Sequence, residues 1–402
     1  MKVLWFSGNP AMYANRSSYN GGGWIASLQQ ELLKIHPNDI KLAIVFPWEA
    51  NIKKQGDNCL YYGIKKIHHA CWNYKGKEQK CLEQIKRIVN DFNPGVIQVF
   101  GTEEIFGLVT TITQVPTIIH LQGILNAYKE AWLPECLSWA KFFLDHPRQI
   151  MEIRGLYRYM EREKRIFSHV KYIFGRTECD YRISNLMAPS AQYYYCSEML
   201  RPNIYYSDKI WFKKQRRVKH IVSIISGAVY KGSDIILRTA KLLKKYFPAD
   251  FIWEVYGVSN LSDAEKYTGI KAVEVNVKTL GVITAQELVN IIINADVFVH
   301  PSYIENSPNT VCEAQILGIP VIATNVGGVS SLVHTGIDGI TVPSNDVYMM
   351  ACQIKRILCN DQLSIDLGHH GRQTALERHN PEKIVEVLVH TYGKMIQEAH
   401  DR

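Results

Sequence analysis

Short apolar runs alternate with amphipathic segments along the first half of the chain. Apolar runs of about four to eight residues between turn residues are typical of buried strands, and apolar residues three or four apart are typical of helices. We expect strands at 2–6, 41–46, 96–100, 117–121, 171–174 and 192–195. We expect helices at 24–35, 80–92, 133–144 and 150–167. This order predicts a mostly parallel sheet with helices on both faces.

A second alternating series follows a polar, basic and irregular stretch at 198–219. Its expected strands are 220–225, 251–256, 273–280, 296–300 and 321–323, and its expected helices are 233–246, 285–293, 347–358, 362–377 and 382–399. We therefore predict two Rossmann-like, doubly wound α/β domains that face each other across a cleft. The first comprises residues 1–205 plus 382–402, and the second comprises 206–381.

Length and composition agree with this division. A chain of 402 residues exceeds one ordinary core and favours two domains of roughly 150–200 residues each. No apolar run approaches the roughly 20 residues needed to span a bilayer, and the apolar N-terminus stops at Ser7, too early for a signal peptide. The nine cysteines form no C-x-x-C pair, which favours isolated thiols in a reducing compartment over disulfides or structural zinc. We expect a cytoplasmic protein.

The net charge of +8 is concentrated in two segments, 209–219 and 154–165. Solvated faces are the favoured explanation. The alternative is peripheral contact with the anionic inner face of a membrane, or attraction of an anionic substrate. No nucleic-acid-binding motif accompanies the charge, so we expect no nucleic-acid partner.

The stretch 297–314 predicts a strand, a short loop and a helix. Pro308 suits the first helical position, because its missing N–H would be unpaired there, and Asn306 or Ser307 can cap the helix. Gly318 ends that helix. The loop and the helix start therefore lie at the carboxyl end of a strand, where ligands of such sheets bind.

Two acids flank this helix start. The free N–H groups of Asn309, Thr310 and Val311 would form an anion site there, while Glu305 and Glu313 would repel an anion. A ligand that carries both phosphate and hydroxyl groups resolves the conflict, because amides bind the phosphate and carboxylates bind the hydroxyls. An acid pair of a glycosidase is disfavoured, since Glu313 lies inside the helix.

Other candidate positions follow strands in both domains. The glycines 21–23 and 327–328 allow close backbone approach to a ligand, although a flexible surface loop would also contain them. Lys231 follows strand 220–225 and can meet a phosphate as a point charge, unless it is simply exposed. His120 ends its strand, and taken alone it is better explained as a hydrogen-bonded structural histidine.

Together these residues resemble a known family. Glu305 and Glu313 with seven residues between them, the run 318–323 and Gly327-Gly328 resemble retaining glycosyltransferase family 4. The resemblance covers about 221–342, and the first domain matches in outline only. It implies a GT-B fold with the active site between the domains, a C-terminal helix that crosses back to the first domain, and transfer of a sugar with retention. It further implies a nucleotide-diphosphate sugar as donor, no cofactor and no essential metal.

The resemblance also implies roles for individual residues. Glu313 would bind the ribose hydroxyls, Glu305 the hydroxyls of the donor sugar and Lys231 the diphosphate, while His120 would sit near the reacting sugar. We therefore predict Glu305, His120 and Lys231 as catalytic residues. The predicted donor-binding residues are Glu313, Asn309, Thr310, Gly22, Gly23, Gly327 and Ser226.

Two departures from the family pattern concern the phosphate. Ser226 stands where family members usually carry an arginine, five residues before Lys231. Pro308 removes an amide in a segment where glycines are common. Lys231 would then neutralise more of the diphosphate than usual, with Arg176 as a candidate to compensate.

Alternatives stay open at this point. A nucleotide-sugar epimerase or a phosphorylase could use the same architecture, and a non-catalytic sugar-binding protein would be expected to lack the acid pair or the lysine. We expect the acceptor to be a saccharide or a lipid-linked acceptor, in polysaccharide or glycolipid synthesis. Tyr128, Trp132 and Trp139 could stack on it, but a place in the core is favoured.

Overall fold

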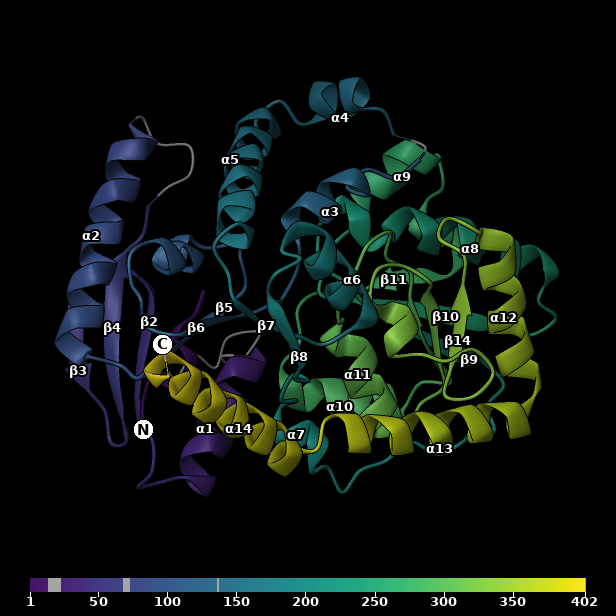
Figure 1. Cartoon of the computed structure of the whole chain (residues 1–402). Coiled ribbons are helices and arrows are strands. Elements are labelled where there is room, and N and C mark those ends of the chain that lie inside the picture. Colours follow the sequence, from purple (N-terminus) through teal and green to yellow (C-terminus); the bar gives the residue numbers. More distant parts are fainter. Residues whose placement is uncertain (14–22, 68–72, 136, 402) are drawn as a thin grey trace.

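Two separate β-sheets, joined by one crossing segment and one long helix, organise the molecule (Figure 1). This computed structural model describes residues 1–13, 23–67, 73–135 and 137–401. Both sheets are almost entirely parallel, and helices cover both faces of each. The predicted fold class, two Rossmann-like domains in a GT-B arrangement, is confirmed.

The first sheet has the strand order β3-β4-β2-β1-β5-β6-β7-β8. All neighbours are parallel except β3 and β4. Its strands are β1 (Lys2–Phe6), β2 (Lys41–Trp48), β3 (Ile52–Gln55), β4 (Cys59–Lys65), β5 (Val96–Phe100), β6 (Thr117–His120), β7 (Tyr172–Gly175) and β8 (Gln192–Tyr195).

Successive residues of a strand point to opposite faces, and this alternation divides the first core in two. Leu4 and Phe6 pack on the face that α2 and α5 cover, while Val3 and Trp5 pack with α1 and α14. The helices of this half are α1 (Gly23–Ile35), α2 (Tyr74–Phe92), α3 (Leu125–Glu130), α4 (Trp139–Asp145), α5 (Gln149–Phe167), α6 (Glu178–Met187) and α14 (Pro381–His400).

The second sheet has the order β11-β10-β9-β12-β13-β14, and all its neighbours are parallel. Its strands are β9 (Lys219–Ile224), β10 (Phe251–Tyr256), β11 (Val277–Thr279), β12 (Val297–His300), β13 (Val321–Thr324) and β14 (Ile340–Val342). The helices are α7 (Pro202–Tyr205), α8 (Ser233–Tyr246), α9 (Ser262–Thr268), α10 (Ala285–Ile293), α11 (Asn309–Leu317), α12 (Val347–Cys359) and α13 (Asp361–Arg378).

The last helix crosses back to the first domain, as predicted (Figure 1). Tyr392 on α14 is fully buried, and its hydroxyl accepts a hydrogen bond from the Trp5 indole at 2.9 Å and donates one to Gln98. The helix therefore belongs to the core of the first domain although it follows the second in sequence. This anchoring ties the two domains together at a second point.

Some expected elements differ from the structure. The predicted helix 133–144 is wrong: α3 ends at Glu130, the chain turns at Pro134, and α4 starts only after Ser138, whose side chain caps it by accepting from the amide of Lys141. The predicted place of Tyr128, Trp132 and Trp139 in the core is also wrong, because all three rings are only partly buried.

The domain boundary at 205/206 stays a prediction. It falls in the segment between β8 and β9, and Leu200 and Ile204 from that segment pack into the core of the second domain. Their packing indicates that the chain passes from the first domain to the second between Tyr195 and Leu200. The helix α14 begins at Pro381, beside the predicted return to the first domain at 382.

Candidate active site

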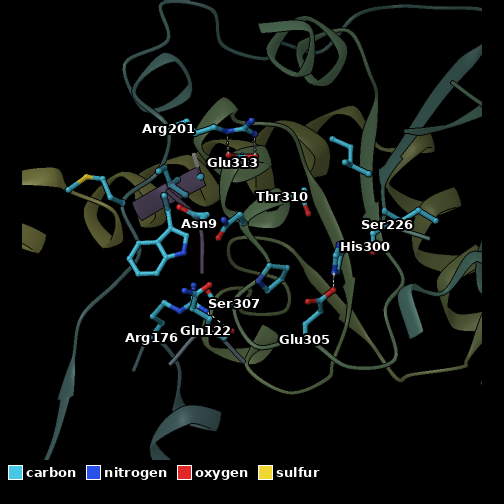
Figure 2. A pocket seen from close by; sticks show the side chains of 18 of the residues that line it. Asn9, Gln122, Arg176, Arg201, Ser226, His300, Glu305, Ser307, Thr310 and Glu313 are labelled. Carbon is cyan, nitrogen blue, oxygen red and sulfur yellow. Dashed lines mark hydrogen bonds and ion pairs between the residues drawn. The ribbon is translucent and has the colours of Figure 1, made fainter. Parts of the chain in front are cut away.

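A cavity of about 560 Å³ lies between the two sheets, where the carboxyl ends of their strands face each other (Figure 2). The first domain lines it with Asn9, Gln122 and Arg176, which follow β1, β6 and β7. Opposite them, Ser226 follows β9 and His300 ends β12. Its volume is within the range of small-molecule sites, and its place at the strand ends is where open α/β sheets bind ligands.

Most of the predicted site residues meet in this cavity. Seven of them line it, namely Gly23, Ser226, Lys231, Glu305, Asn309, Thr310 and Glu313. Gly22 lies outside the described residues. His120 and Gly327 are not among the described residues that line the cavity.

Glu305 is the centre of a buried polar network. Its Oε1 accepts hydrogen bonds from Lys231 Nζ at 2.5 Å and Ser302 Oγ at 2.8 Å, and lies 3.0 Å from His300 Nε2. Burial by itself would raise the pKa of Glu305, but the hydrogen bond with His300 and the charge of Lys231 outweigh it and lower this pKa to about 2. Glu305 is therefore a carboxylate at neutral pH, paired with Lys231, the one lysine among the described residues that line the cavity.

Gly327 supports this acid from behind. Its φ is +51°, and a Cβ built on it would lie only 1.8 Å from the carbonyl oxygen of Glu305. The next amide, that of Gly328, donates to the same oxygen at 3.1 Å. In the described structure Gly327 thus fixes the backbone of the loop that carries Glu305. Its contact with the donor stays a prediction.

The helix α11 begins one residue later than predicted. Pro308 is its extended N-cap and has no side-chain cap bond, so the expectation that it occupies the first helical position is wrong. Its carbonyl accepts a hydrogen bond of 2.9 Å from the amide of Val311. The Val311 amide is therefore not free, although it is one of the three that the sequence predicts to be free. Asn309 and Thr310 remain at the cavity wall, at the positive end of the helix.

The predicted caps of α11 bind other groups. Ser307 Oγ donates to Glu198 Oε1 at 2.6 Å, and Asn306 accepts from Thr177 Oγ1 at 3.1 Å and donates to the Gln122 carbonyl at 3.0 Å. Capping by either residue is therefore contradicted. Tertiary partners from the first domain and the crossing segment have replaced the local cap, a competition that sequence reasoning could not foresee.

Glu313 is held by an arginine that sequence analysis missed. Arg201 Nε lies 2.8 Å and its Nη2 2.7 Å from the two carboxylate oxygens, a bidentate pair visible at one end of the cavity in Figure 2. Burial raises the pKa of Glu313, and Arg201 acts against this rise. Because each carboxylate oxygen has a second lone pair, the pair leaves Glu313 able to accept hydroxyl groups. No motif marked Arg201, which lies 112 residues away in the chain.

Arg176 brings a further cation to the cavity, from the first domain, in addition to Lys231 and Arg201. Its Nη2 donates to the Gln122 carbonyl at 2.7 Å, its Nη1 lies 3.5 Å from Glu198, and its guanidinium lies 5.7 Å from the ring centre of Trp24. Burial would raise the pKa of Glu198, but Arg176 helps to lower it to about 2. Arg176 therefore faces the ligand space while fixed by a buried carboxylate.

His120 is buried beneath the wall of the cavity. Its Nε2 lies 3.2 Å from the Cys196 carbonyl and its Nδ1 3.2 Å from the Gln98 amide nitrogen, and its ring lies 4.9 Å from that of Trp24. Burial, reinforced by the charge of Arg176, lowers the pKa of His120 to about 3, so its imidazole is neutral. The described geometry puts Trp24 in contact with His120, and a catalytic role for this histidine stays a prediction.

One group could offer metal ligands among the residues that the structure describes. Atoms of Glu198, Cys312 and His379 lie within 4.8 Å of one another and are buried. Glu198 already pairs with Arg176, and both nitrogens of the His379 ring have hydrogen-bond partners. The side chains of Glu198 and His379 therefore already bind neighbouring protein groups in the wall between the domains.

Comparison with known proteins gives a family match for the second domain. Residues 219–360 match the model of the family described as glycosyl transferases group 1. This part of the chain is similar in sequence to the group 1 glycosyltransferases. The resemblance to retaining glycosyltransferase family 4 is thereby confirmed.

Curated relatives match the second domain in sequence, and solved structures match the whole chain in fold. The capsular polysaccharide biosynthesis glycosyltransferase CapM of Staphylococcus aureus is 32% identical over 109 residues, 27% of this chain and 29% of CapM. Sucrose-phosphate synthase from Thermosynechococcus elongatus covers 99% of both chains with a TM-score of 0.76 at 17% identity. HepE from Anabaena, solved with UDP and glucose, covers 98% of this chain and 100% of its own with a TM-score of 0.66 at 14% identity.

Proposed function

We propose that the protein is a retaining glycosyltransferase that moves a sugar from a nucleotide-diphosphate sugar to an acceptor hydroxyl. One observation carries this proposal: the ionised Glu305 and the cation Lys231 meet at the start of α11, inside a cavity between two domains. Anion-binding and hydroxyl-binding groups therefore share one ligand space, which suits a diphosphate attached to a sugar.

The roles of individual residues follow from their places. Lys231 and the positive end of α11 would stabilise the charge that develops on the leaving diphosphate, an electrostatic contribution to the transition state. Glu305 would accept hydroxyl groups of the donor sugar. Glu313, at the far end of the cavity beside Arg201, would accept the ribose hydroxyls. Arg176 approaches from the opposite wall and would supply the cation that Ser226 does not provide.

The reaction course follows from which acids are available. Glu305 and Glu313 are the carboxylates among the described residues that line the cavity, and each is bound to a cation. A covalent sugar–enzyme intermediate on such an engaged carboxylate is disfavoured. We therefore favour displacement on a single face of the sugar, in which the leaving phosphate accepts the proton of the acceptor hydroxyl.

The donor is proposed to be a UDP-sugar, with support from the solved complex of HepE with UDP and glucose. The acceptor is proposed to be a saccharide, free or linked to a lipid, with support from the capsular polysaccharide function named for CapM. Peripheral contact with an anionic membrane stays a prediction. Of the helices in the described ranges, none combines the length and the apolarity that a bilayer crossing requires.

Release of UDP from a panel of UDP-sugars, with and without acceptors, tests the proposal. Lys231→Ala is expected to lower turnover about 100-fold, the effect of losing one group that stabilises transition-state charge. Lys241→Ala, an exposed lysine on the following helix, is the matched control and should keep full activity. Equal activity of Lys231→Ala and the native protein would contradict the assignment. Epimerised donor in the absence of any acceptor would instead support the epimerase alternative.

A further inference from the structure

Glu198 is a fully buried residue of the segment where the chain passes from the first domain to the second. Its carboxylate reaches both domains. On the side of the first domain, Oε2 lies 3.5 Å from Arg176 Nη1. On the side of the second domain, Oε1 accepts a hydrogen bond of 2.6 Å from Ser307 Oγ and lies 3.4 Å from Cys312 Sγ. One side chain therefore joins the two walls of the cavity.

The backbone of Glu198 also binds the segment by which the chain returns to the first domain. His379 lies two residues before the start of α14, and its Nε2 accepts a hydrogen bond of 3.0 Å from Arg378 Nε. Burial lowers the pKa of His379 to about 4, so the proton of the neutral ring is on Nδ1. This nitrogen lies 3.0 Å from the Glu198 carbonyl. Both passages of the chain between the domains thus meet at Glu198.

Arg176 is the partner of Glu198 that belongs to the cavity wall. Its guanidinium has two fixed points, Glu198 and the Gln122 carbonyl, to which Nη2 donates at 2.7 Å. A buried ion pair adds little net stability, because the lost hydration of both charges offsets their attraction. Its orienting effect matters more: a cation that is aimed before charge develops stabilises that charge without reorganisation.

We propose that Glu198 is a positioning residue that couples closure of the two domains to the placement of Arg176 at the diphosphate. In the closed arrangement, Ser307 and Cys312 hold the carboxylate where it aims Arg176 along the cavity wall. An open arrangement would separate Arg176 from Ser307, and the carboxylate could then hold only one of them. The proposal rests on the proposed glycosyl transfer, and it adds that this cation is placed only when the cavity closes.

Binding of UDP, measured by calorimetry, tests the proposal without turnover, and uridine is the probe that lacks phosphate. Glu198→Gln keeps the size of the side chain and removes its charge. We expect this variant to bind UDP about tenfold more weakly, because an arginine that is no longer fixed loses part of a charge-assisted contact. Its affinity for uridine should stay unchanged, whereas general damage to the site would weaken the binding of both probes.

A double-mutant cycle shows whether Glu198 acts through Arg176. Arg176→Ala should weaken UDP binding at least as much as Glu198→Gln does, and the double variant should bind UDP no more weakly than Arg176→Ala alone. Ser307→Ala removes the contact from the second domain, and its effect should also vanish in the Arg176→Ala background. Additive losses overturn the proposal. Unchanged or tighter UDP binding by Glu198→Gln overturns it as well, since Glu198 would then only neutralise Arg176.

Two further variants complete the test. Glu198→Asp keeps the charge and shortens the side chain by one methylene group, so it tests position alone even where Arg176→Ala does not fold. It should also weaken UDP binding, and native affinity would contradict a positioning role. Glu161→Gln, which breaks an exposed pair with Lys164 at 2.6 Å on α5, is the matched control and should change nothing. Failure of the native protein to bind UDP would contradict the proposed function too, whereas native UDP affinity in Glu198→Gln contradicts this inference alone.

Discussion

At the scale of the residue, two buried acids on one short stretch have opposite pKa shifts. Their partners set the difference: Glu305 has Lys231 from another segment and His300 from the same stretch, whereas Glu313 has Arg201 from another segment against its burial. Burial penalises both carboxylates, and the number of favourable contacts decides the outcome. The E-x7-E spacing could therefore identify both acids without indicating how strongly each is held ionised.

The depressed pKa of Glu305 predicts an acid-labile contribution to stability. Because the folded pKa of about 2 lies below the ordinary value of an unfolded glutamate, the contribution is fully present above about pH 4.3 and is lost as the pH falls toward 2. We expect Glu305→Gln to be less stable than the native protein at pH 7, by on the order of 2 kcal/mol. Urea unfolding of both proteins between pH 7 and pH 3 measures the difference, which should shrink with acid. A difference independent of pH would contradict the assigned ion pair.

At the scale of the element, the loop between β12 and α11 is shaped by packing more than by its own sequence. The local signals favoured a cap from Asn306 or Ser307, and contacts from other segments took both side chains. The loop is instead braced by the close approach of Gly327 to the Glu305 carbonyl. A glycine is required there for two reasons, its positive φ and the space behind it.

Two glycine substitutions separate these reasons. Gly327→Ala adds a Cβ that would clash with the Glu305 carbonyl at 1.8 Å, while Gly336→Ala, with a φ of +83°, meets nothing within 4 Å. We expect Gly336→Ala to cost about 1 kcal/mol, the strain of a left-handed alanine, and Gly327→Ala to cost about 3 kcal/mol or more. Chemical unfolding measures both. UDP binding should weaken only in Gly327→Ala, and equal effects of the two would show that close approach is unimportant.

At the scale of the whole molecule, the two domains touch on both sides of the cavity. Asn306 bonds Thr177 and the Gln122 carbonyl, and Tyr230 of the second domain packs its ring 5.7 Å from Tyr128 and 4.9 Å from Trp132. Beyond the cavity, α4 reaches across to α9, where Lys266 pairs with Asp145 at 2.5 Å (Figure 1). The described conformation is thus closed, and closure excludes water from a transfer reaction.

Asn306→Ala tests this closure. It removes two hydrogen bonds between the domains and leaves the buried Thr177 hydroxyl without Asn306, at a cost of about 1–3 kcal/mol to the closed form alone. We expect a larger radius of gyration by small-angle X-ray scattering in the absence of ligand, restored in part by UDP. Ser331→Ala, which loses an exposed contact with the Glu178 amide, is the control and should stay closed. A native radius for Asn306→Ala would show that this residue does not govern closure.

The sequence by itself determined the two alternating series, the parallel sheets and seven of the residues that line the cavity. Such features follow from local periodicity and from the rule that strand ends gather functional residues, and both can be read from neighbouring positions in the chain. Helices α6 and α9 and strand β14 were not predicted, since short elements carry little periodic signal. Only the tertiary structure decided the partners of the acids, the burial of His120 and the pairing of Arg201 with Glu313. The physical reason is that charge pairing and burial depend on residues that lie far apart in the chain and meet only when the domains have folded and closed.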